Sequence, residues 1–415
     1  MAVVKPFPAY RYSPKAGDPS RLVTQPYDKI SPDLQARYLA ASPYNLVRII
    51  LGERFDSDNE SNNVYTRAAD YFHDWIRAGI LTQDGRPAFY SYSQEFVVPD
   101  TGERATRAGF IGLGKLEDYS AGVIYRHERT LSGPKKDRLD LLRHTRAHFG
   151  QIFMLYPDPE GAVEKLLQTG QPLMEVRDDY QARHRISAIT DPETVGRIEQ
   201  SMADRRLLIA DGHHRYETAL AYARENPALP SAEYAMMTFV NMHSPGLKIL
   251  ATHRVLRHLP GFDAASFFRR VAQNWTVTRL ESPSSITRND ALHGALQVHD
   301  PLRLKIGVIA AGEVYLLGRP RREGELDVPA LHHEILRGIL GIGEEEVRDE
   351  KHITYVRGMG AAAAEVFDQG AQIAFLLQPT PIEDMASIAF SGGVMPQKST
   401  DFYPKLLSGL TIYRL

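Results

Sequence analysis

The spacing of apolar side chains predicts an amphipathic helix in the N-terminal part of the chain. Within residues 63–80, apolar side chains recur at intervals of three and four positions, at Tyr65, Ala68, Tyr71, Phe72, Trp75 and Ile76. This period places them along one face of a helix, and Gly79 is a typical stop signal. We expect this helix to be scaffold, with its aromatic side chains in the core.

Farther along, the alternation of apolar and polar positions predicts strands. Residues 87–98 are rich in aromatic side chains, Pro-Asp-Thr-Gly follows at residues 99–102, and residues 104–115 resume the pattern. A β-hairpin is the expected structure. A shorter strand at residues 122–125 runs into charged side chains, and a helix is expected over residues 138–148.

The pattern changes abruptly around Asp211 and Gly212. Residues 207–210, Leu-Leu-Ile-Ala, form a short apolar run that is typical of a buried strand. Apolar side chains then return with helical spacing from Tyr216 to Ala223. A strand, a tight turn and a helix are therefore predicted in direct succession.

A Pro-Gly break near residue 259 is the expected domain boundary. We expect an α/β domain over residues 1–259 and a smaller α+β domain over residues 260–415, so the overall prediction is a mixed α/β protein. The apolar stretch at residues 358–377 is interrupted by Glu365 and Asp368. Charges there would be costly in a bilayer, so we expect a helix followed by a strand and no membrane span.

Composition and charge narrow the class of protein. The sequence has 415 residues, 43% of them hydrophobic and 24% charged, which is ordinary for a globular protein of two or three domains. The net charge of −2 gives no uniform basic field, so we expect no nucleic-acid partner. The N-terminus has early prolines and no continuous apolar stretch. We therefore expect no secretory signal, no membrane partner and a cytoplasmic location.

The sequence contains no cysteine. Disulfides, thiolate-bound zinc, iron–sulfur clusters and sulfur nucleophiles are thereby excluded, and any metal must be bound by His, Asp or Glu. His144 and His148 have a spacing of one helical turn, which suits zinc. No Glu stands beside His144 to activate a water, so we do not expect a zinc protease.

The predicted turn at residues 211–215, Asp-Gly-His-His-Arg, has the side chains of an anion site. The first N–H groups of a helix have no partner within it and lie at the positive end of its dipole. Gly212 permits a tight turn, Arg215 offers a fork that matches phosphate oxygens, and Asp211 can hold a metal or a substrate amine. His213 and His214 could bind phosphate or transfer protons. The alternative is that Asp211 only caps the helix and that the histidines are polar residues of its first turn.

Glu128 is a candidate general base. It follows a predicted strand, so its carboxylate could be directed into a cleft, within reach of the proton of a substrate hydroxyl. The alternative is an exposed ion pair with Arg126 or Arg129, which would have no role in chemistry.

Two basic groups could bind further phosphate. Lys135, Lys136 and Arg138 are close together in sequence and could hold a polyphosphate, although interleaved aspartates also fit a solvated loop. Lys398 and Lys405 flank a hydroxyl-bearing turn near the C-terminus. That turn could be a second phosphate clamp or could simply cap the end of the fold.

Several motifs together resemble the domain-of-unknown-function 1015 family. They are residues 26–28 (Pro-Tyr-Asp), 43–45 (Pro-Tyr-Asn), 127–130 (His-Glu-Arg-Thr), 134–138 (Pro-Lys-Lys-Asp-Arg), 210–220 (Ala-Asp-Gly-His-His-Arg-Tyr-Glu-Thr-Ala-Leu) and 395–405 (Met-Pro-Gln-Lys-Ser-Thr-Asp-Phe-Tyr-Pro-Lys). The resemblance spans almost the whole chain, and the combination is specific to that family, whose own activity is poorly defined.

The turn at residues 211–215 is also similar to the phosphate-binding turn of the ParB/sulfiredoxin superfamily. That superfamily includes nucleotide-dependent free-serine kinases, CTP-binding partition proteins and sulfiredoxins, and the similarity implies a ParB/sulfiredoxin-like core with insertions within residues 1–259. Sulfiredoxin activity is excluded because it needs a cysteine where His214 stands. Partition proteins need a helix-turn-helix and a basic surface, neither of which the sequence shows. The kinase branch remains.

The resemblance implies a nucleotide-dependent, kinase-like phosphotransferase for a small hydroxyl metabolite, with free serine as one candidate. It also implies a nucleotide (ATP, ADP or CTP) and Mg²⁺, with Asp211 as the metal ligand. The expected catalytic residues are Glu128 as the base, then Asp211, His213 and His214, with Asp28 as a further candidate base. The residues expected to hold phosphate are Gly212, Arg215, Lys135, Arg138 and Lys398.

Two other functions would use the same turn. A phosphomonoesterase would use water in place of the acceptor hydroxyl and would release phosphate without a nucleotide. A nucleotide-gated binding protein would bind CTP or ATP at the turn and move its C-terminal domain, without turnover.

Overall fold

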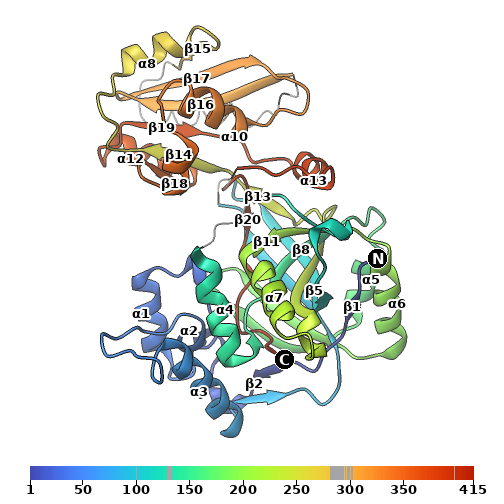
Figure 1. The fold of residues 1–415 in the computed structure, drawn as a ribbon. Coiled ribbons are helices and arrows are strands. Elements are labelled where there is room, and N and C mark those ends of the chain that lie inside the picture. Colours follow the sequence, from blue (N-terminus) through green and yellow to red (C-terminus); the bar gives the residue numbers. More distant parts are fainter. Residues whose placement is uncertain are drawn as a thin grey trace. The chain divides into compact units, whose positions relative to one another are not determined.

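The chain forms two compact units of mixed α/β structure, as predicted for the fold class (Figure 1). The computed structural model describes residues 1–99, 101–128, 133–280, 294, 296, 300, 302–396 and 398–415. The first unit consists of Met1–Val98, Glu103–Lys248 and Pro404–Leu415, and the second of Pro99–Gly102 and Ile249–Tyr403. The domain boundary at residue 259 stays a prediction, because compactness does not show which part of a chain folds independently.

A nine-stranded sheet forms the centre of the first unit. Its strand order is β6-β11-β8-β12-β5-β4-β10-β9, and β1 also pairs with β5. The strands are β1 (Val4–Lys5), β4 (Phe89–Val97), β5 (Arg104–Lys115), β6 (Ile124–Arg126), β8 (Ile152–Tyr156), β9 (Gln171–Arg177), β10 (Arg183–Ile189), β11 (Leu207–Asp211) and β12 (Tyr234–Asn241). The predicted hairpin is β4 and β5, which pair antiparallel with Tyr90 opposite Ile111. Every residue of β8 is buried, so this end of the sheet is covered on both faces.

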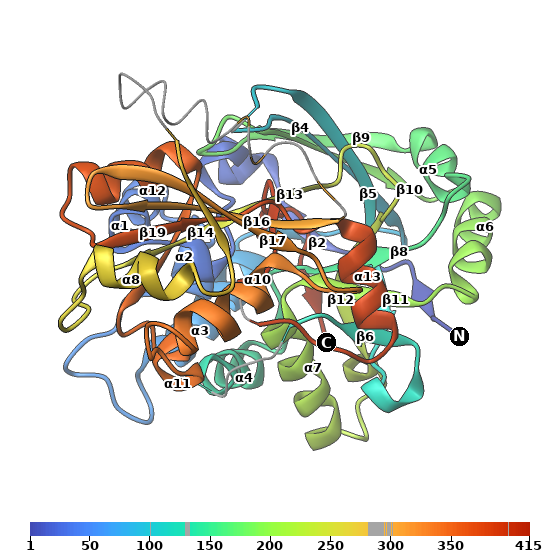
Figure 2. The same ribbon diagram turned by 90° about the horizontal axis from the view of Figure 1, so that it is seen from above.

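Helices and short strand pairs complete the first unit. The helices are α1 (Pro32–Ala41), α2 (Val47–Ile50), α3 (Val64–Arg77), α4 (Gly133–Thr145), α5 (Ala162–Leu166), α6 (Pro192–Ala203) and α7 (His213–Glu225). The strand pairs are β2 (Tyr10–Tyr12) with β3 (Leu81–Gln83) and β7 (Ala147–His148) with β21 (Tyr413–Arg414). α5 and α6 lie side by side (Figure 1, Figure 2).

The predicted amphipathic helix is α3. The Asn63 side chain accepts hydrogen bonds from the first turn of this helix, and the backbone N–H of Asn63 donates one to the Thr66 hydroxyl oxygen. Ala68, Phe72 and Trp75 are buried on its inner face, as the spacing predicted. α3 is therefore scaffold.

The helix predicted over residues 138–148 lies earlier in the chain. α4 begins at Gly133 and ends at Thr145. A proline in the first helical turn gives up no hydrogen bond, so Pro134 does not delay the start of the helix. His148 belongs to β7, and the single-turn spacing that suited zinc with His144 does not occur.

The second unit is built on a six-stranded sheet of order β15-β17-β16-β19-β14-β18. Its strands are β14 (Thr252–Leu256), β15 (Thr276–Arg279), β16 (Arg303–Ala310), β17 (Glu313–Pro320), β18 (Ile353–Arg357) and β19 (Ile373–Leu376), and β13 (Lys248–Leu250) pairs separately with β20 (Asp401–Tyr403). Its helices are α8 (Ala264–Val271), α10 (Asp327–Ala330) with a π-helical turn at Leu331–Arg337, α11 (Glu344–Arg348), α12 (Met359–Phe367) and α13 (Ile382–Phe390). The membrane-like stretch is α12 and β19, as predicted.

The C-terminal segment is built into the first unit. Ile412 exchanges backbone hydrogen bonds with Tyr10, and Ser408 does so with Thr24. Ile412 is fully buried in the same cluster as Phe72 and Phe149. These contacts fix the path of the backbone that carries Lys405. Among the residues described, no helix combines the length and apolarity that crossing a membrane requires.

Candidate functional site

The predicted strand, turn and helix are present at Asp211. β11 ends at Asp211, α7 begins at His213, and Gly212 between them has a φ of +90°. Left-handed backbone of this kind favours glycine. A Cβ at Gly212 would lie only 3.0 Å from the guanidinium carbon of Arg215. Glycine therefore both forms the turn and lets the Arg215 side chain fold back over it.

A neighbouring parallel strand brings Glu128 toward the same edge of the sheet. β6 runs parallel to β11, with Arg126 opposite Ile209, so the carboxyl ends of the two strands meet at one edge. Glu128 follows the end of β6, as Asp211 stands at the end of β11. Arg126 pairs with Glu217 at 3.4 Å rather than with Glu128, and Arg129 lies outside the described residues.

His127 links the two strand ends. Its Nδ1 lies 2.8 Å from the carbonyl oxygen of Ile209, and because a carbonyl only accepts, Nδ1 carries the proton. Burial lowers the pKa of His127, so the ring is neutral at pH 7 and its Nε2 presents a lone pair. That Nε2 lies 3.7 Å from Oε1 of Glu128.

The Asp211 carboxylate lies between two cations. Lys405 Nζ donates a 3.0 Å hydrogen bond to Oδ2, and an Arg215 Nη is 3.6 Å from Oδ1. Arg215 also donates to the carbonyl oxygen of Gln151. Burial by itself raises the pKa of Asp211, but the charges of Lys405 and Arg215, with a smaller effect from Lys29, hold it well below the ordinary 3.8. The carboxylate is therefore ionised at any physiological pH.

The lysine at this turn is Lys405. Sequence reasoning noted both tail lysines but selected Lys398, which belongs to the second unit, where its carbonyl accepts a hydrogen bond from Arg254. Lys405 is in the segment Pro404–Leu415, which returns to the first unit. The apolar run that follows it, from Leu406 to Ile412, is the signal that could have marked this segment as part of the core.

His213 and His214 differ in environment. His213, the first residue of α7, is buried, and its ring packs edge-to-face on His127 with centroids 4.9 Å apart. Burial lowers the pKa of His213 well below 6.5, so this ring is neutral as well. Its Nε2 has no hydrogen-bond partner within the described parts of the chain. His214 is half-buried.

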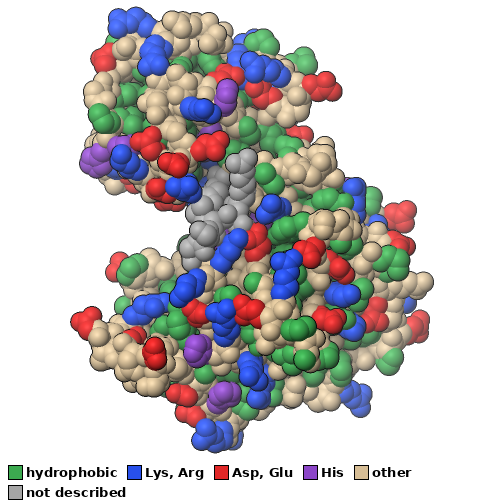
Figure 3. Space-filling model, viewed as in Figure 1, with side chains coloured by type: hydrophobic (Ala, Val, Ile, Leu, Met, Phe, Trp, Pro, Cys, Tyr) green, Lys and Arg blue, Asp and Glu red, His purple; other side chains and the backbone are tan. Residues whose placement is uncertain are grey.

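The basic residues of α4 are held by carboxylates. Lys135 pairs with Glu217 of α7, and the exposed Lys136 pairs with Asp140 at 3.4 Å. Arg138 donates to Asp137 and, at 2.7 Å, to the carbonyl oxygen of Ile50. Figure 3 shows basic and acidic side chains interleaved on the face that α4 and α7 contribute to. Lys135 and Lys136 are therefore compensated charges.

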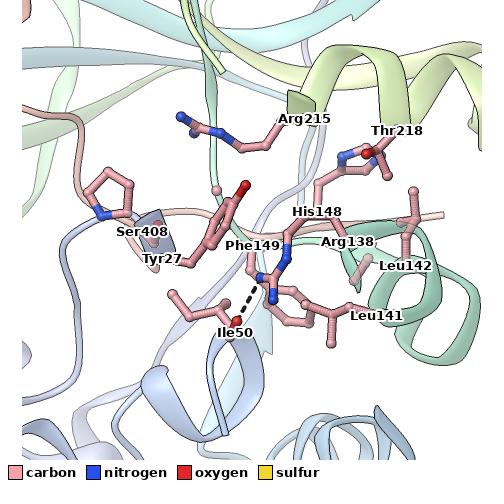
Figure 4. Close-up of a pocket in the computed structure, with 13 residues that line it drawn as sticks. Tyr27, Ile50, Arg138, Leu141, Leu142, His148, Phe149, Arg215, Thr218 and Ser408 are labelled. Atoms are coloured by element: carbon pink, nitrogen blue, oxygen red, sulfur yellow. Dashed lines mark hydrogen bonds between the residues drawn. The ribbon is translucent and has the colours of Figure 1, made fainter. Parts of the chain in front are cut away.

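A pocket opens beside the turn and shares Arg215 with it (Figure 4). Its empty volume, which includes space open to solvent, is about 590 Å³. The polar side chains that line it are Tyr27, Arg138, His148, Arg215, Thr218 and Ser408. Its apolar walls are formed mainly by Ile50, Leu141, Leu142 and Phe149. This mixture of polar and apolar side chains is typical of a small-molecule site.

The donor set at Asp211 does not favour a resident metal ion. Both carboxylate oxygens already face cations, and within the described ranges no group of three His, Asp or Glu side chains could hold a metal. His144 is exposed on α4, and its Nδ1 lies 2.7 Å from the carbonyl oxygen of Asp140. The arrangement is better suited to an anion than to a metal cation.

Comparisons with known proteins identify relatives of the chain. A family model described as "Protein of unknown function (DUF1015)" matches residues 4–333. No curated protein matches. Among solved structures, a conserved hypothetical protein from Pyrococcus furiosus is 12% identical over 70% of this chain and 92% of that one, with a TM-score of 0.37. A free serine kinase in complex with AMP is 11% identical over 68% and 83%, with a TM-score of 0.36. A C-terminally truncated SbnI from Staphylococcus aureus is 12% identical over 72% and 87%, with a TM-score of 0.34.

Proposed function

This chain belongs to the DUF1015 family, and from the geometry at Asp211 and the resemblance of its turn to that of free-serine kinases we propose that it is a nucleotide-dependent phosphotransferase. In this proposal the turn binds the phosphates of ATP, ADP or CTP, and the acceptor is a small hydroxyl metabolite. Free serine is the first acceptor to test, because the turn resembles that of free-serine kinases. The ParB/sulfiredoxin-like core belongs to the same proposal.

The observation that carries the proposal is the pair of cations, Lys405 and Arg215, gathered at the start of α7. Lys405 and Arg215 contact the single carboxylate of Asp211, and Lys29 adds a third cation whose field reaches it. The first N–H groups of α7 and its dipole add to this field. A phosphate at the turn would meet two fixed cations and backbone donors in a partly buried site, where charge-assisted hydrogen bonds are strong.

The residues divide into phosphate-binding and proton-transfer roles. Arg215, Lys405 and the amides after Gly212 bind phosphate, and Asp211 holds the two cations in position. Lys405 thus takes the part expected of Lys398. Glu128, next to the neutral His127, accepts the proton of the acceptor hydroxyl.

Magnesium, where used, would be bound mainly by the phosphates. Mg²⁺ prefers several oxygen ligands and keeps much of its water, so it is often held by one or two carboxylates together with substrate phosphates. Asp211 is engaged by Lys405 and Arg215, and we derive no step through a metal on it. Phosphate binding at the turn should therefore persist in the presence of a chelator.

One observation favours a nucleotide-gated switch as the second candidate. Lys405 belongs to the segment that leaves the second unit at Tyr403 and enters the first at Pro404. The backbone between them is continuous. A ligand that shifts Lys405 would therefore also shift the backbone that enters from the second unit. In this version the turn binds nucleotide without transferring phosphate.

Phosphorus NMR tests the proposal. The full chain is incubated with magnesium and ATP, ADP or CTP, with and without pooled amino acids and sugars, beside Lys405→Met. We expect a phosphomonoester signal that depends on both nucleotide and acceptor and is lost in the variant. Phosphate release from phosphomonoesters without nucleotide would instead identify a phosphatase. Tight nucleotide binding without turnover would identify the switch, and no binding at all would contradict the site.

A further inference from the structure

The pocket beside the turn contains a buried hydroxyl without a partner. Thr218 lies on α7 and lines the pocket, and the residue is 5% exposed. Its Oγ1 makes no hydrogen bond with the part of the chain that the structure describes. Unpaired polar atoms are rare in protein interiors, because burial deprives them of water. A bound molecule in the pocket could supply the missing hydrogen-bond partner of the Thr218 hydroxyl.

The walls of the pocket suit a flat, largely apolar ring. Tyr27 and Phe149 present aromatic rings, and Ile50 and Leu141 supply aliphatic surface (Figure 4). The Arg138 guanidinium lies 4.1 Å from the centre of the Tyr27 ring, which holds that ring in place. A small polar acceptor such as an amino acid would leave this apolar surface without contacts.

Within the pocket Arg138 is paired with Asp137 and the other polar groups are uncharged, whereas the end shared with the turn carries the charge of Arg215. Burial lowers the pKa of His148 to about 4, so this ring is neutral at pH 7 and can either donate or accept. Thr218 and His148 both line the pocket. Arg215 is the residue that the pocket and the phosphate-binding turn share. A ligand with a neutral, hydrogen-bonding ring at one end and negative charge at the other fits this polarity.

We propose that this pocket binds the base of the nucleotide, with its ring against Tyr27 and Phe149, its edge hydrogen-bonded to Thr218 and His148, and its phosphates beyond Arg215. This inference rests on the proposed function and adds to it that the base, and not the phosphate alone, is recognised. Base-on-aromatic stacking tolerates any base, so the hydrogen bonds at the edge decide which base is preferred.

Calorimetric titration of the full chain tests this with ATP, GTP, CTP, UTP and inorganic tripolyphosphate. We expect at least one nucleotide to bind about five- to a hundredfold more tightly than tripolyphosphate, the contribution of one stacked base. Thr218→Val keeps the shape of the side chain and removes the hydroxyl, so it should lower the affinity for that nucleotide by about two- to tenfold. The affinity for tripolyphosphate should not change in this variant. Its melting temperature should not fall either, because no internal hydrogen bond is lost.

A second pair of variants tests the ring contacts. Tyr27→Leu should remove most of the difference in affinity between the nucleotide and tripolyphosphate. Tyr180→Leu, at a side chain that is 52% exposed, is the matched control and should leave that difference unchanged. If tripolyphosphate binds as tightly as every nucleotide, the base pocket is overturned while the phosphate site stands. If nucleotides keep their advantage in both Thr218→Val and Tyr27→Leu, the base binds elsewhere. If neither class of ligand binds, the proposed function fails as well.

Discussion

The Asp211 carboxylate holds together two cations that are far apart in sequence. Lys405 contacts one of its oxygens and Arg215 approaches the other. Without Asp211 these two cations would repel each other and would each take another conformation. If the turn binds phosphate as proposed, Asp211 holds the two cations in position before any ligand arrives, which reduces the entropy lost on binding.

At the residue scale, we predict that Lys405→Met lowers the free energy of unfolding by about 1.5–3 kcal/mol at pH 7, the usual contribution of a charged hydrogen bond. Asp211 has a lowered pKa when folded, so its stabilising effect is complete above the unfolded pKa of about 3.9 and is lost as pH falls below it. The difference between parent and variant should shrink between pH 5 and pH 2.5 in urea unfolding. Lys136→Met, at an exposed ion pair, is the control and should change stability little.

If Lys405→Met lowers the free energy of unfolding by the same amount at pH 7 and at pH 2.5, its effect comes from lost packing and not from the ion pair.

A second prediction at this scale separates catalysis from binding. Glu128→Gln keeps the shape of the side chain but cannot accept the proton of the acceptor hydroxyl. Nucleotide affinity should stay nearly constant while turnover falls by about a hundred- to ten-thousandfold. Calorimetry and a steady-state assay on the same preparation measure both. Undiminished turnover would transfer the role of base to Asp28, His213 or His214.

At the element scale, the site depends on how β11 passes into α7. The turn has room for only one residue, Gly212, and that residue has a positive φ. The backbone of Gly212 supports the folded-back guanidinium of Arg215. One residue thus sets both the direction of the helix and the position of its arginine.

We predict that Gly212→Ala destabilises the chain by about 1–2 kcal/mol, the cost of left-handed backbone for a residue with a side chain. It should also weaken tripolyphosphate binding, because the new methyl group displaces Arg215. Gly196→Ala is the matched control, because Gly196 lies within α6 with nothing near its Cβ position. Alanine favours the helix more than glycine does, so the free energy of unfolding of this variant should rise by up to about 1 kcal/mol. Denaturant unfolding and calorimetry give both quantities. Unchanged affinity in Gly212→Ala would show that Arg215 does not bind phosphate.

The sequence predicted local elements better than the contacts between them. α3, the β4–β5 hairpin and the turn at Asp211 follow from patterns within a few residues of each other, and all are present. The pairing of Lys405 with Asp211 joins residues 194 positions apart, and no local pattern specifies it. The same holds for Lys135, whose partner Glu217 comes from another helix. Site residues could be nominated from the sequence, but their partners could not.

At the scale of the whole molecule, each unit has a core of its own. Trp75 is buried in a cluster of the first unit with Phe72 and Ile412. Trp275 is buried in the second with Phe267 and Phe375. These are the two tryptophans of the sequence, so each unit carries its own fluorescent reporter.

We predict that tripolyphosphate stabilises the first unit selectively. In Trp275→Phe the remaining Trp75 reports on the first unit, and its unfolding midpoint should rise with ligand concentration, since a ligand stabilises only the state that binds it. In Trp75→Phe the remaining Trp275 should show no shift. Equal shifts of the unfolding midpoint in both variants would mean that the two units unfold together. A shift reported by Trp275 alone would mean that the phosphate site lies in the second unit.

The return of residues 404–415 to the first unit also sets an order of events during synthesis. The ribosome completes residues 1–248 and then adds residues 249–403, nearly all of the second unit, before Lys405 is made. At about 5–20 residues per second, that interval is on the order of ten to thirty seconds. Throughout it the nascent first unit lacks Ile412 in its core and Lys405 beside Asp211. A nascent-chain complex stalled after Tyr403 should therefore have a protease-sensitive first unit that cannot yet bind phosphate.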